Sequence, residues 1–300
     1  MGFTPSVEVV QIIEKEPKFK VRKATLADIP RIVEVDMQSF DKVYQGYVAG
    51  SDELRADLTQ KFTGRLEKVG GKLMPVLERD GEIVGVMVCC PTSKRPEDFK
   101  SWEDTTDNGT LETTYDPKGE NLYVVTLSVL SAGTQAKDKL FVDQMSKMLG
   151  LGYKTAFFES RLPGLKNYAR NRANHTGKTL EYTTAEELDK YAIDYYNKTD
   201  TIDGKEVPYD RLLRLYDRVG CKIIKLVPNA YRDEPSLDYG AVCVYDGSEF
   251  FDGSLLRLKL PRSNSALPVK LPDNKVTRKS LALAMNLVSK SQKLTTKLLG

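Results

Sequence analysis

Residues 73–90, LMPVLERDGEIVGVMVCC, decide how this chain folds. Two runs rich in apolar and β-branched residues flank Asp80-Gly81. An Asp-Gly pair between two such runs is a strong signal for a tight β-hairpin. The stretch therefore predicts two antiparallel neighbouring strands, and the rest of the chain can be placed around them.

Residues 122–130, LYVVTLSVL, are almost wholly apolar or β-branched, as expected of a central buried strand. Thr25 with Asp28, and Thr184 with Glu187, are typical of helix starts. Further strands are predicted at 19–24, 153–158, 221–227 and 237–245, and helices after 25 and at 52–69, 137–149, 184–197 and 207–219. Residues 92–120 and 160–183 are expected to be long loops. This order predicts an α/β fold, a mixed central sheet of about seven strands with helices on both faces.

Composition narrows the classes of function. The chain has 300 residues, of which 40% are hydrophobic and 29% are charged. It contains no apolar run of about 18 residues, so no transmembrane segment is expected, and its N-terminus lacks the order of a secretory signal. The four cysteines lie in apolar runs and are expected to be buried free thiols. With a single histidine, His175, in a polar stretch, no metal site is expected, and a histidine-dependent triad is disfavoured.

The charge is unevenly distributed. Residues 255–300 contain ten Lys or Arg and one acid, Asp273, a net +9, while the remainder of the chain is −6. Residues 277–299 show apolar residues on one helical face and lysines on the other, which predicts an amphipathic basic helix. Such a tail fits a protein partner, a second copy of the chain, nucleic acid or an anionic membrane.

The ordered set of motifs resembles the GNAT (GCN5-related N-acetyltransferase) superfamily. KVRKATLADIPRIVEVDMQSF (20–40) is similar to its first strand and helix, LERDGEIVGVMV (77–88) to its second and third strands, and LYDRVGCKIIKLVPN (215–229) to its last helix-to-strand crossing. SWEDTTDNGTLETTYDPKGENLYVVTLSV (101–129), ESRLPGLKNY (159–168) and VPNAYRDEPSLDYGAVCVYD (227–246) look like bacterial GNAT domains sometimes fused to a carbon–nitrogen hydrolase. The resemblance covers roughly residues 19–246.

The resemblance implies acyl transfer from acetyl-CoA or another acyl-CoA to an amine. In that family the fourth strand, here 123–129, splays from the fifth, and its backbone pairs with the pantetheine arm. Leu127, Ser128 and Val129 would then contact the cofactor. The loop after the strand wraps the diphosphate, with glycines allowing close backbone approach. Here that loop reads Ala132-Gly133-Thr134-Gln135-Ala136-Lys137.

The loop departs from the family's pattern of Arg/Gln-x-x-Gly-x-Gly/Ala. Ala132 stands at the usual arginine, and Gln135 and Lys137 stand at two usual glycines, so we expect a degenerate cradle. Asp138 adds a negative charge where an anion should bind. The interpretation of 132–137 as a plain strand-to-helix turn therefore stays open beside cofactor binding.

Two catalytic candidates follow. Tyr216 lies four residues before Gly220, the position of the family's acid tyrosine, although it could equally be an ordinary packed aromatic. The related subgroup often has a carboxylate on the fourth strand; Thr126 stands there, and Glu159, at the end of the fifth strand, is the candidate substitute base. Arg161, Lys166, Arg170 and Arg172 form a basic stretch that fits a CoA phosphate, nucleic acid or a solvated loop.

Three hypotheses result. The first is an N-acyltransferase of unknown acceptor. The second is a catalytically empty GNAT fold, a pseudoenzyme that serves as a structural or assembly component, for example of a virus particle, anchored by its tail. The third is a nucleic-acid-associated protein. Whether the chain is an enzyme is left open. We expect a lead-in at 1–18, a GNAT-like domain at 19–246 and a basic extension at 247–300, in a cytoplasmic or intracellularly assembled, not secreted, protein.

Overall fold

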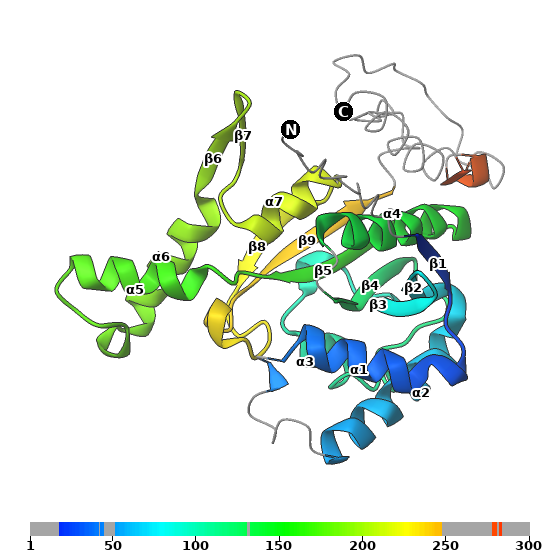
Figure 1. The fold of residues 1–300 in the computed structure, drawn as a ribbon. Coiled ribbons are helices and arrows are strands. Elements are labelled where there is room, and N and C mark those ends of the chain that lie inside the picture. The colour runs from blue at the N-terminus through cyan, green and yellow to red at the C-terminus, as the bar shows by residue number, and fades with distance from the viewer. Residues whose placement is uncertain are drawn as a thin grey trace, which may run out of the picture.

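A single mixed sheet organises the molecule. The computed structural model describes residues 18–41, 43–44, 52–130, 133–247, 278–280 and 282–283. Seven strands lie in the order β1-β2-β3-β4-β5-β9-β8 (Figure 1). β4 and β5 are parallel, and each other neighbouring pair is antiparallel. The strands are β1 (Phe19–Lys23), β2 (Pro75–Arg79), β3 (Glu82–Thr92), β4 (Asn121–Val129), β5 (Thr155–Arg161), β8 (Lys222–Val227) and β9 (Gly240–Asp246). The predicted sheet is confirmed.

The predicted hairpin forms between β2 and β3. Asp80 and Gly81 connect the strands with φ angles of 53° and 95°. Two successive left-handed residues are what a two-residue turn needs to match the twist of its strands. β3 is buried along almost its whole length, because helices cover both of its faces.

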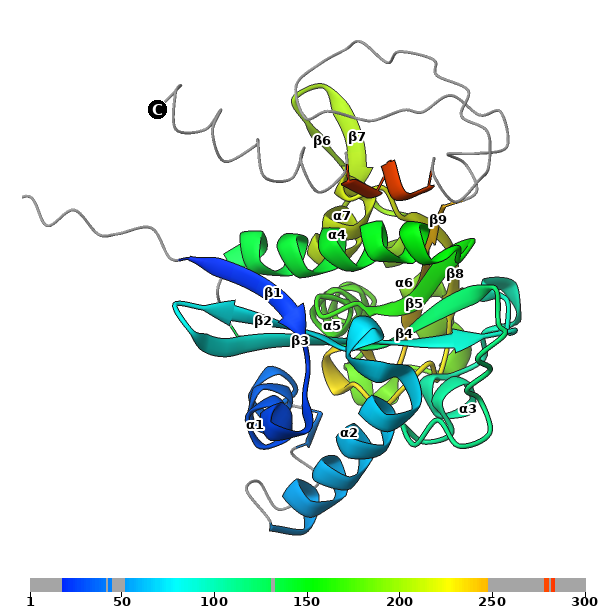
Figure 2. The same cartoon turned by 90° about the vertical axis from the view of Figure 1, so that its right-hand side faces the viewer.

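Helices cover the sheet on both sides. α1 (Ile29–Ser39), α2 (Asp52–Leu73) and the short α3 (Trp102–Thr106) lie on one face, and α4 (Gly133–Leu151) and α7 (Arg211–Arg218) lie on the other (Figure 2). α3 falls within the segment 92–120, which was expected to be a loop.

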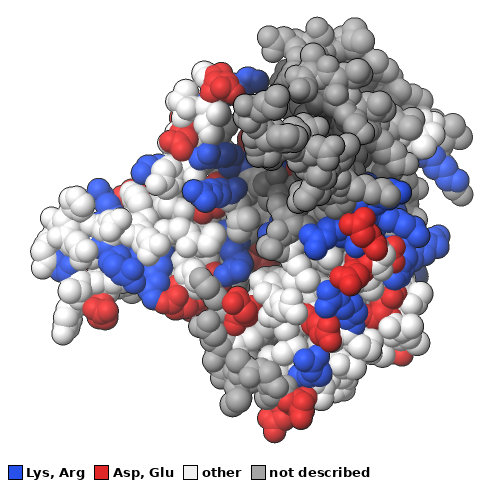
Figure 3. Space-filling view, viewed as in Figure 1, with Lys and Arg blue, Asp and Glu red and all other residues white. Residues whose placement is uncertain are grey.

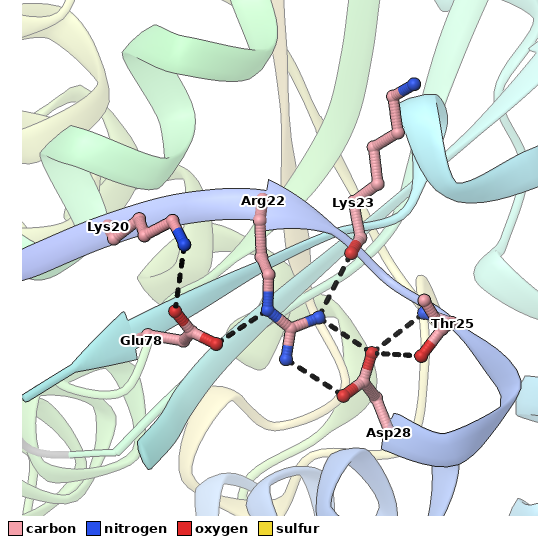
Figure 4. A network of polar contacts seen from close by, with 6 residues as sticks. All are labelled: Lys20, Arg22, Lys23, Thr25, Asp28 and Glu78. Atoms are coloured by element: carbon pink, nitrogen blue, oxygen red, sulfur yellow. Dashed lines mark hydrogen bonds and ion pairs between the residues drawn. The ribbon is translucent and has the colours of Figure 1, made fainter. Parts of the chain in front are cut away.

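Polar contacts fix the entry of the chain into α1 (Figure 4). Arg22 on β1 donates to Glu78 on β2 at 2.6 Å and to both carboxylate oxygens of Asp28 at 2.8 and 2.9 Å. Asp28 also accepts from the backbone and hydroxyl of Thr25, so the predicted helix start is confirmed. The Arg22 hydrogen bonds lower the pKa of Asp28 to about 2.

A module of about fifty residues follows β5 and projects from the sheet (Figure 1). It contains α5 (Leu165–His175), α6 (Ala185–Asn197) and the hairpin of β6 (Thr199–Ile202) and β7 (Lys205–Pro208). The expectation of a loop at 160–183 is wrong, because Ala169 and Ala173 on α5 are buried with Tyr191 of α6. His175 ends α5 in an exposed position, with Nδ1 2.6 Å from the Asn171 carbonyl.

The basic stretch found in the sequence is mostly ion-paired. Arg161 pairs with Asp233, Lys166 with Glu234, and Arg172 with Asp194. Figure 3 shows acidic side chains among the basic ones over α5 and α6. The predicted free thiols are confirmed, since all four cysteines are buried and unbonded to one another.

The expected lead-in, 1–18, lies outside the described residues except for Lys18. The basic extension, 247–300, is described at Gly247 and at 278–280 and 282–283, where the backbone is helical. The predictions about the tail's partners therefore stay predictions. Within the described part of the chain, no helix is long and apolar enough to cross a membrane.

Candidate functional site

The two parallel strands separate before they end. β4 and β5 pair over three positions, from Asn121 with Thr155 to Tyr123 with Phe157, although β4 continues to Val129 and β5 to Arg161. β4 also bulges against β3, because Thr126 pairs with Val88 and Val124 with Cys89, which leaves Val125 as the extra residue. Past Tyr123 the edge of β4 that faces β5 has no ladder partner.

A cavity of about 520 Å³ occupies this divergence. Its walls come from both faces of the sheet: α1, α2 and α3 on one side, the first turn of α4 and part of α7 on the other, with the ends of β4 and β5 and the loop before β9 between them. The volume is that of a small-molecule site.

Glu159 lies in the cavity on β5. The Tyr123 hydroxyl donates to its Oε2 at 2.5 Å, and the Tyr123 ring packs edge-on against Phe157, two residues before Glu159. The carboxyl keeps some surface accessible inside the cavity, but protein atoms enclose it closely. Burial raises the pKa of Glu159 to about 8, against the smaller opposing effect of the Tyr123 hydrogen bond. Near neutral pH this carboxyl can therefore accept or release a proton, as a general base requires.

Tyr216 enters the same cavity from α7. Its ring packs edge-on against Phe158, with centroids 4.6 Å apart, and lies 6.1 Å from Phe141 of α4. Its hydroxyl makes no hydrogen bond within the described part of the chain. Burial raises the pKa of Tyr216 far above its usual value, so the phenol stays protonated and can act as a donor. The structure thus brings Glu159 and Tyr216, 57 positions apart, to one cavity.

The predicted cofactor strand is partly as expected. Leu127 and Val129 line the cavity, whereas Ser128 is not among the lining residues and its hydroxyl donates to Asp36 at 2.5 Å. The indole N–H of Trp102 donates to the Val125 carbonyl at 2.9 Å, so a side chain from α3 occupies a backbone acceptor of the bulge. No local pattern predicts this contact, because Trp102 lies in a polar segment that is expected to be a loop.

The loop after β4 is described in part. Ala132 lies outside the described residues, α4 begins at Gly133, and the side chains of Thr134 and Gln135 are likewise not described. Ala136 is buried. Degeneracy of the cradle therefore stays a prediction. Asp138 was expected to repel an anion, but Arg218 on α7 pairs with it at 2.7 Å and offsets its charge.

Lys137 and Arg161 both face the cavity. Lys137 makes no hydrogen bond or ion pair with the described residues, and burial, with a contribution from Arg161, lowers its pKa. Arg161 holds the buried Asp233 at 2.5 Å and lies over the Phe40 ring, while its Nε is buried without a partner.

Asp36 is a site residue that sequence reasoning missed. The carboxylate lost from the fourth strand at Thr126 is present beside it, supplied by α1: Asp36 is buried and accepts from Tyr44 at 2.7 Å, Ser128 at 2.5 Å and Thr126 at 3.3 Å. The signal was an acid on the apolar stripe of α1, one turn after Ile32. Among the described residues no three His, Cys, Asp or Glu side chains gather as metal ligands would.

Solved structures that resemble this chain include GNAT proteins. The loading GNATL domain of CurA from Lyngbya majuscula superposes with a TM-score of 0.54 at 16% identity, over 77% of this chain and 99% of that one. The GphF GNAT-like decarboxylase in complex with isobutyryl-CoA gives 0.49 at 17% identity, over 76% and 98%. A ribosomal-protein-alanine N-acetyltransferase from Brucella melitensis gives 0.40 at 13% identity, over 76% and 99%.

No protein-family model matches the sequence, and no curated protein matches it. With the sheet order and the first of these likenesses, the chain has the GNAT fold. Its expected closeness to the hydrolase-fused subgroup stays a prediction.

Proposed function

We propose that the protein is an acyl-CoA-dependent N-acyltransferase whose reaction takes place between β4 and β5, with Glu159 as base and Tyr216 as acid. One observation supports this most: a carboxyl whose pKa is raised to about 8 and a protonated phenol converge from opposite faces of β5 on a cavity of about 520 Å³. Enzymes often use two groups with different pKa values, one as the general base and the other as the general acid.

The fit of an acyl-CoA rests on the open edge of β4. Past Tyr123 the strand has no ladder to β5, which leaves backbone groups for an extended amide-containing arm. α4 begins at Gly133, four positions after the last residue of β4, and a helix N-terminus favours phosphate.

The reaction assigned to these groups balances as follows. The amine nitrogen attacks the thioester carbonyl and forms the C–N bond, while Glu159 accepts a proton from nitrogen. The C–S bond breaks, and Tyr216 gives its proton to the leaving sulfur. Exchange with solvent then returns Glu159 and Tyr216 to their starting states. The products are an amide and free CoA.

Calorimetry with acetyl-CoA, followed by thiol release in the presence of amines, tests the proposal. We expect saturable binding, and amine-dependent release of CoA that falls in Glu159→Gln while binding is kept. Where Tyr216 is changed to Phe, the matched control is Tyr182→Phe, because the Tyr182 side chain is 80% exposed. Absence of binding at millimolar acetyl-CoA would contradict the proposal.

The assembly role and the nucleic-acid role remain alternative proposals. Both rest on the basic extension, of which six residues are described, and no described contact favours either.

A further inference from the structure

The cavity has an unbalanced distribution of charge. Lys137 from α4 and Arg161 from β5 approach closely enough for the Arg161 charge to weaken protonation of Lys137. Two cations in a partly desolvated space repel each other, and an anion between them relieves that repulsion. Asp233 already binds Arg161 but leaves its Nε without a partner, and Lys137 has no partner among the described residues.

Two of the acids on the cavity wall already have partners. Asp57 forms a 2.8 Å ion pair with Lys61, and Asp36 accepts three hydroxyl hydrogen bonds near the buried Arg65. These acids are therefore not available as counterions for Lys137. The Lys137–Arg161 end of the cavity, which we call the cationic end, has room for one more negative charge.

The opposite charge lies near Glu159. Glu103 on α3 lines the cavity, forms no ion pair among the described residues, and its negative charge acts on Glu159 and Tyr123. An ammonium or amine arriving at Glu159 would be stabilised by Glu103. The cavity thus favours a ligand with a positive charge near Glu159 and a negative charge at the cationic end.

Strand geometry sets the spacing of the two preferences. Glu159 and Arg161 are two residues apart on β5, so they point to the same face with their Cα atoms roughly 6.6 Å apart. A ligand that satisfies both must carry an amine and an anionic group separated by only a few bonds.

We propose that the acceptor is a free amino acid, whose carboxylate lies between Lys137 and Arg161 and whose amine lies at Glu159. This assignment rests on the proposed acyl transfer and makes the product an N-acyl amino acid. The amine nitrogen forms a C–N bond to the acyl group, and the thioester C–S bond breaks. Glu159 accepts a proton from nitrogen, and Tyr216 gives a proton to sulfur. The carboxylate takes no part in bond changes; it orients the amine.

The test compares acceptors that differ in the presence of the anion or in its distance from the amine. CoA release from acetyl-CoA is measured with alanine, β-alanine and γ-aminobutyrate, and with alaninamide, which keeps the amine but lacks the carboxylate. We expect kcat/KM for the best amino acid to exceed that for its amide by roughly ten- to a hundredfold, the worth of a charged hydrogen bond. In Lys137→Met this ratio should fall towards one. The ratio is independent of any change in acyl-CoA binding, because both acceptors share the donor.

Two further variants keep the result interpretable. Lys118→Met removes the same charge from an exposed loop position outside the cavity and should leave the ratio unchanged. Arg161→Lys keeps a counterion for buried Asp233, so it should fold while reducing the preference for amino acids.

The outcomes separate the two proposals. If alaninamide is acylated as well as alanine, the amino-acid assignment is overturned and acyl transfer stands. If a larger carboxylated donor such as succinyl-CoA binds more tightly than acetyl-CoA in a Lys137-dependent manner, the anion belongs to the acyl group and the acceptor assignment is overturned. If acetyl-CoA does not bind, but N-acetylalanine still raises the melting temperature of the wild type and of Lys118→Met but not of Lys137→Met, acyl transfer fails and the carboxylate site stands.

Discussion

The Tyr123 hydroxyl donates a 2.5 Å hydrogen bond to Glu159 at the point where β4 and β5 part. Tyr123 belongs to the last paired position of β4, while Glu159 lies two residues past the last paired position of β5. The bond therefore lies where the two strands begin to diverge, and it holds the candidate base in place. It also favours the ionised carboxyl, in opposition to the burial that favours the neutral form.

Tyr123→Phe should move the pH dependence of acyl transfer. A base must be deprotonated to act, so kcat/KM should rise through a midpoint near the pKa of about 8 of Glu159. Without the Tyr123 hydrogen bond, burial acts unopposed, and we expect the midpoint to rise by roughly one unit. The measurement is kcat/KM against pH at saturating acyl-CoA. An unshifted midpoint would show that another group is the base.

Glu159→Gln should change stability as well as activity. Because the folded pKa of about 8 exceeds the ordinary value of 4.5, the folded protein holds a proton that the unfolded chain releases. The contribution of Glu159 to stability should therefore decline as pH rises from about 4.5 to about 8 and be constant above that range. Glutamine does not titrate, so the variant should lack this decline. We expect the decline in the free energy of unfolding to be on the order of 2 kcal/mol, because water in the cavity screens the carboxylate. Urea unfolding at several pH values measures it; identical curves for both proteins would contradict the burial of this carboxyl.

Tyr216→Phe should reduce turnover without unfolding the protein. The hydroxyl has no hydrogen bond to lose among the described residues, and the ring contacts with Phe158 and Phe141 remain. We expect kcat to fall by about a hundredfold, as for loss of a general acid, with unchanged acyl-CoA affinity. Single-turnover kinetics and calorimetry separate the two effects. A variant with full kcat would make Tyr216 a packing residue.

Asp28→Asn should alter stability in acid. The pKa of Asp28 is lowered to about 2, chiefly by Arg22, so the stabilisation it gives is present above about pH 4 and is lost as pH falls through 2. Because the pair is partly solvated, we expect on the order of 1 kcal/mol. Between pH 2 and 5, the free energy of unfolding should change less with pH in the variant than in the wild type. Asp80→Asn, at an exposed hairpin carboxylate, is the comparison.

Local signals made most of the fold predictable. Asp80-Gly81 requires left-handed backbone whatever surrounds it, and residues 122–130 have too little polar surface to lie outside a sheet. α5 was missed because Arg170, Arg172 and several asparagines conceal an apolar stripe of small residues. Burial of an alanine face depends on the partner helix, which local sequence does not reveal.

The family resemblance indicated Glu159 and Tyr216, and both line the cavity. Their catalytic roles stay predictions. Asp36 was missed, and the effect of Asp138 was misjudged, for the same reason: the groups that define their roles, Ser128 and Arg218, are 92 and 80 positions away in the chain. Long-range partners of charged residues are not encoded in spacing.

Because the module between β5 and α7 projects from the sheet, the chain can be cut there while the two fragments stay associated through the sheet. The β6–β7 hairpin turns at Asp203-Gly204, an exposed pair, and a cleavage there leaves Glu159 on one fragment and Tyr216 on the other. β9 on the second fragment pairs with all seven residues of β5 on the first. The fragments can therefore serve as a two-piece test of the proposed acyl transfer: each alone lacks one of the two candidate catalytic residues, and CoA release is expected only when the sheet is reassembled.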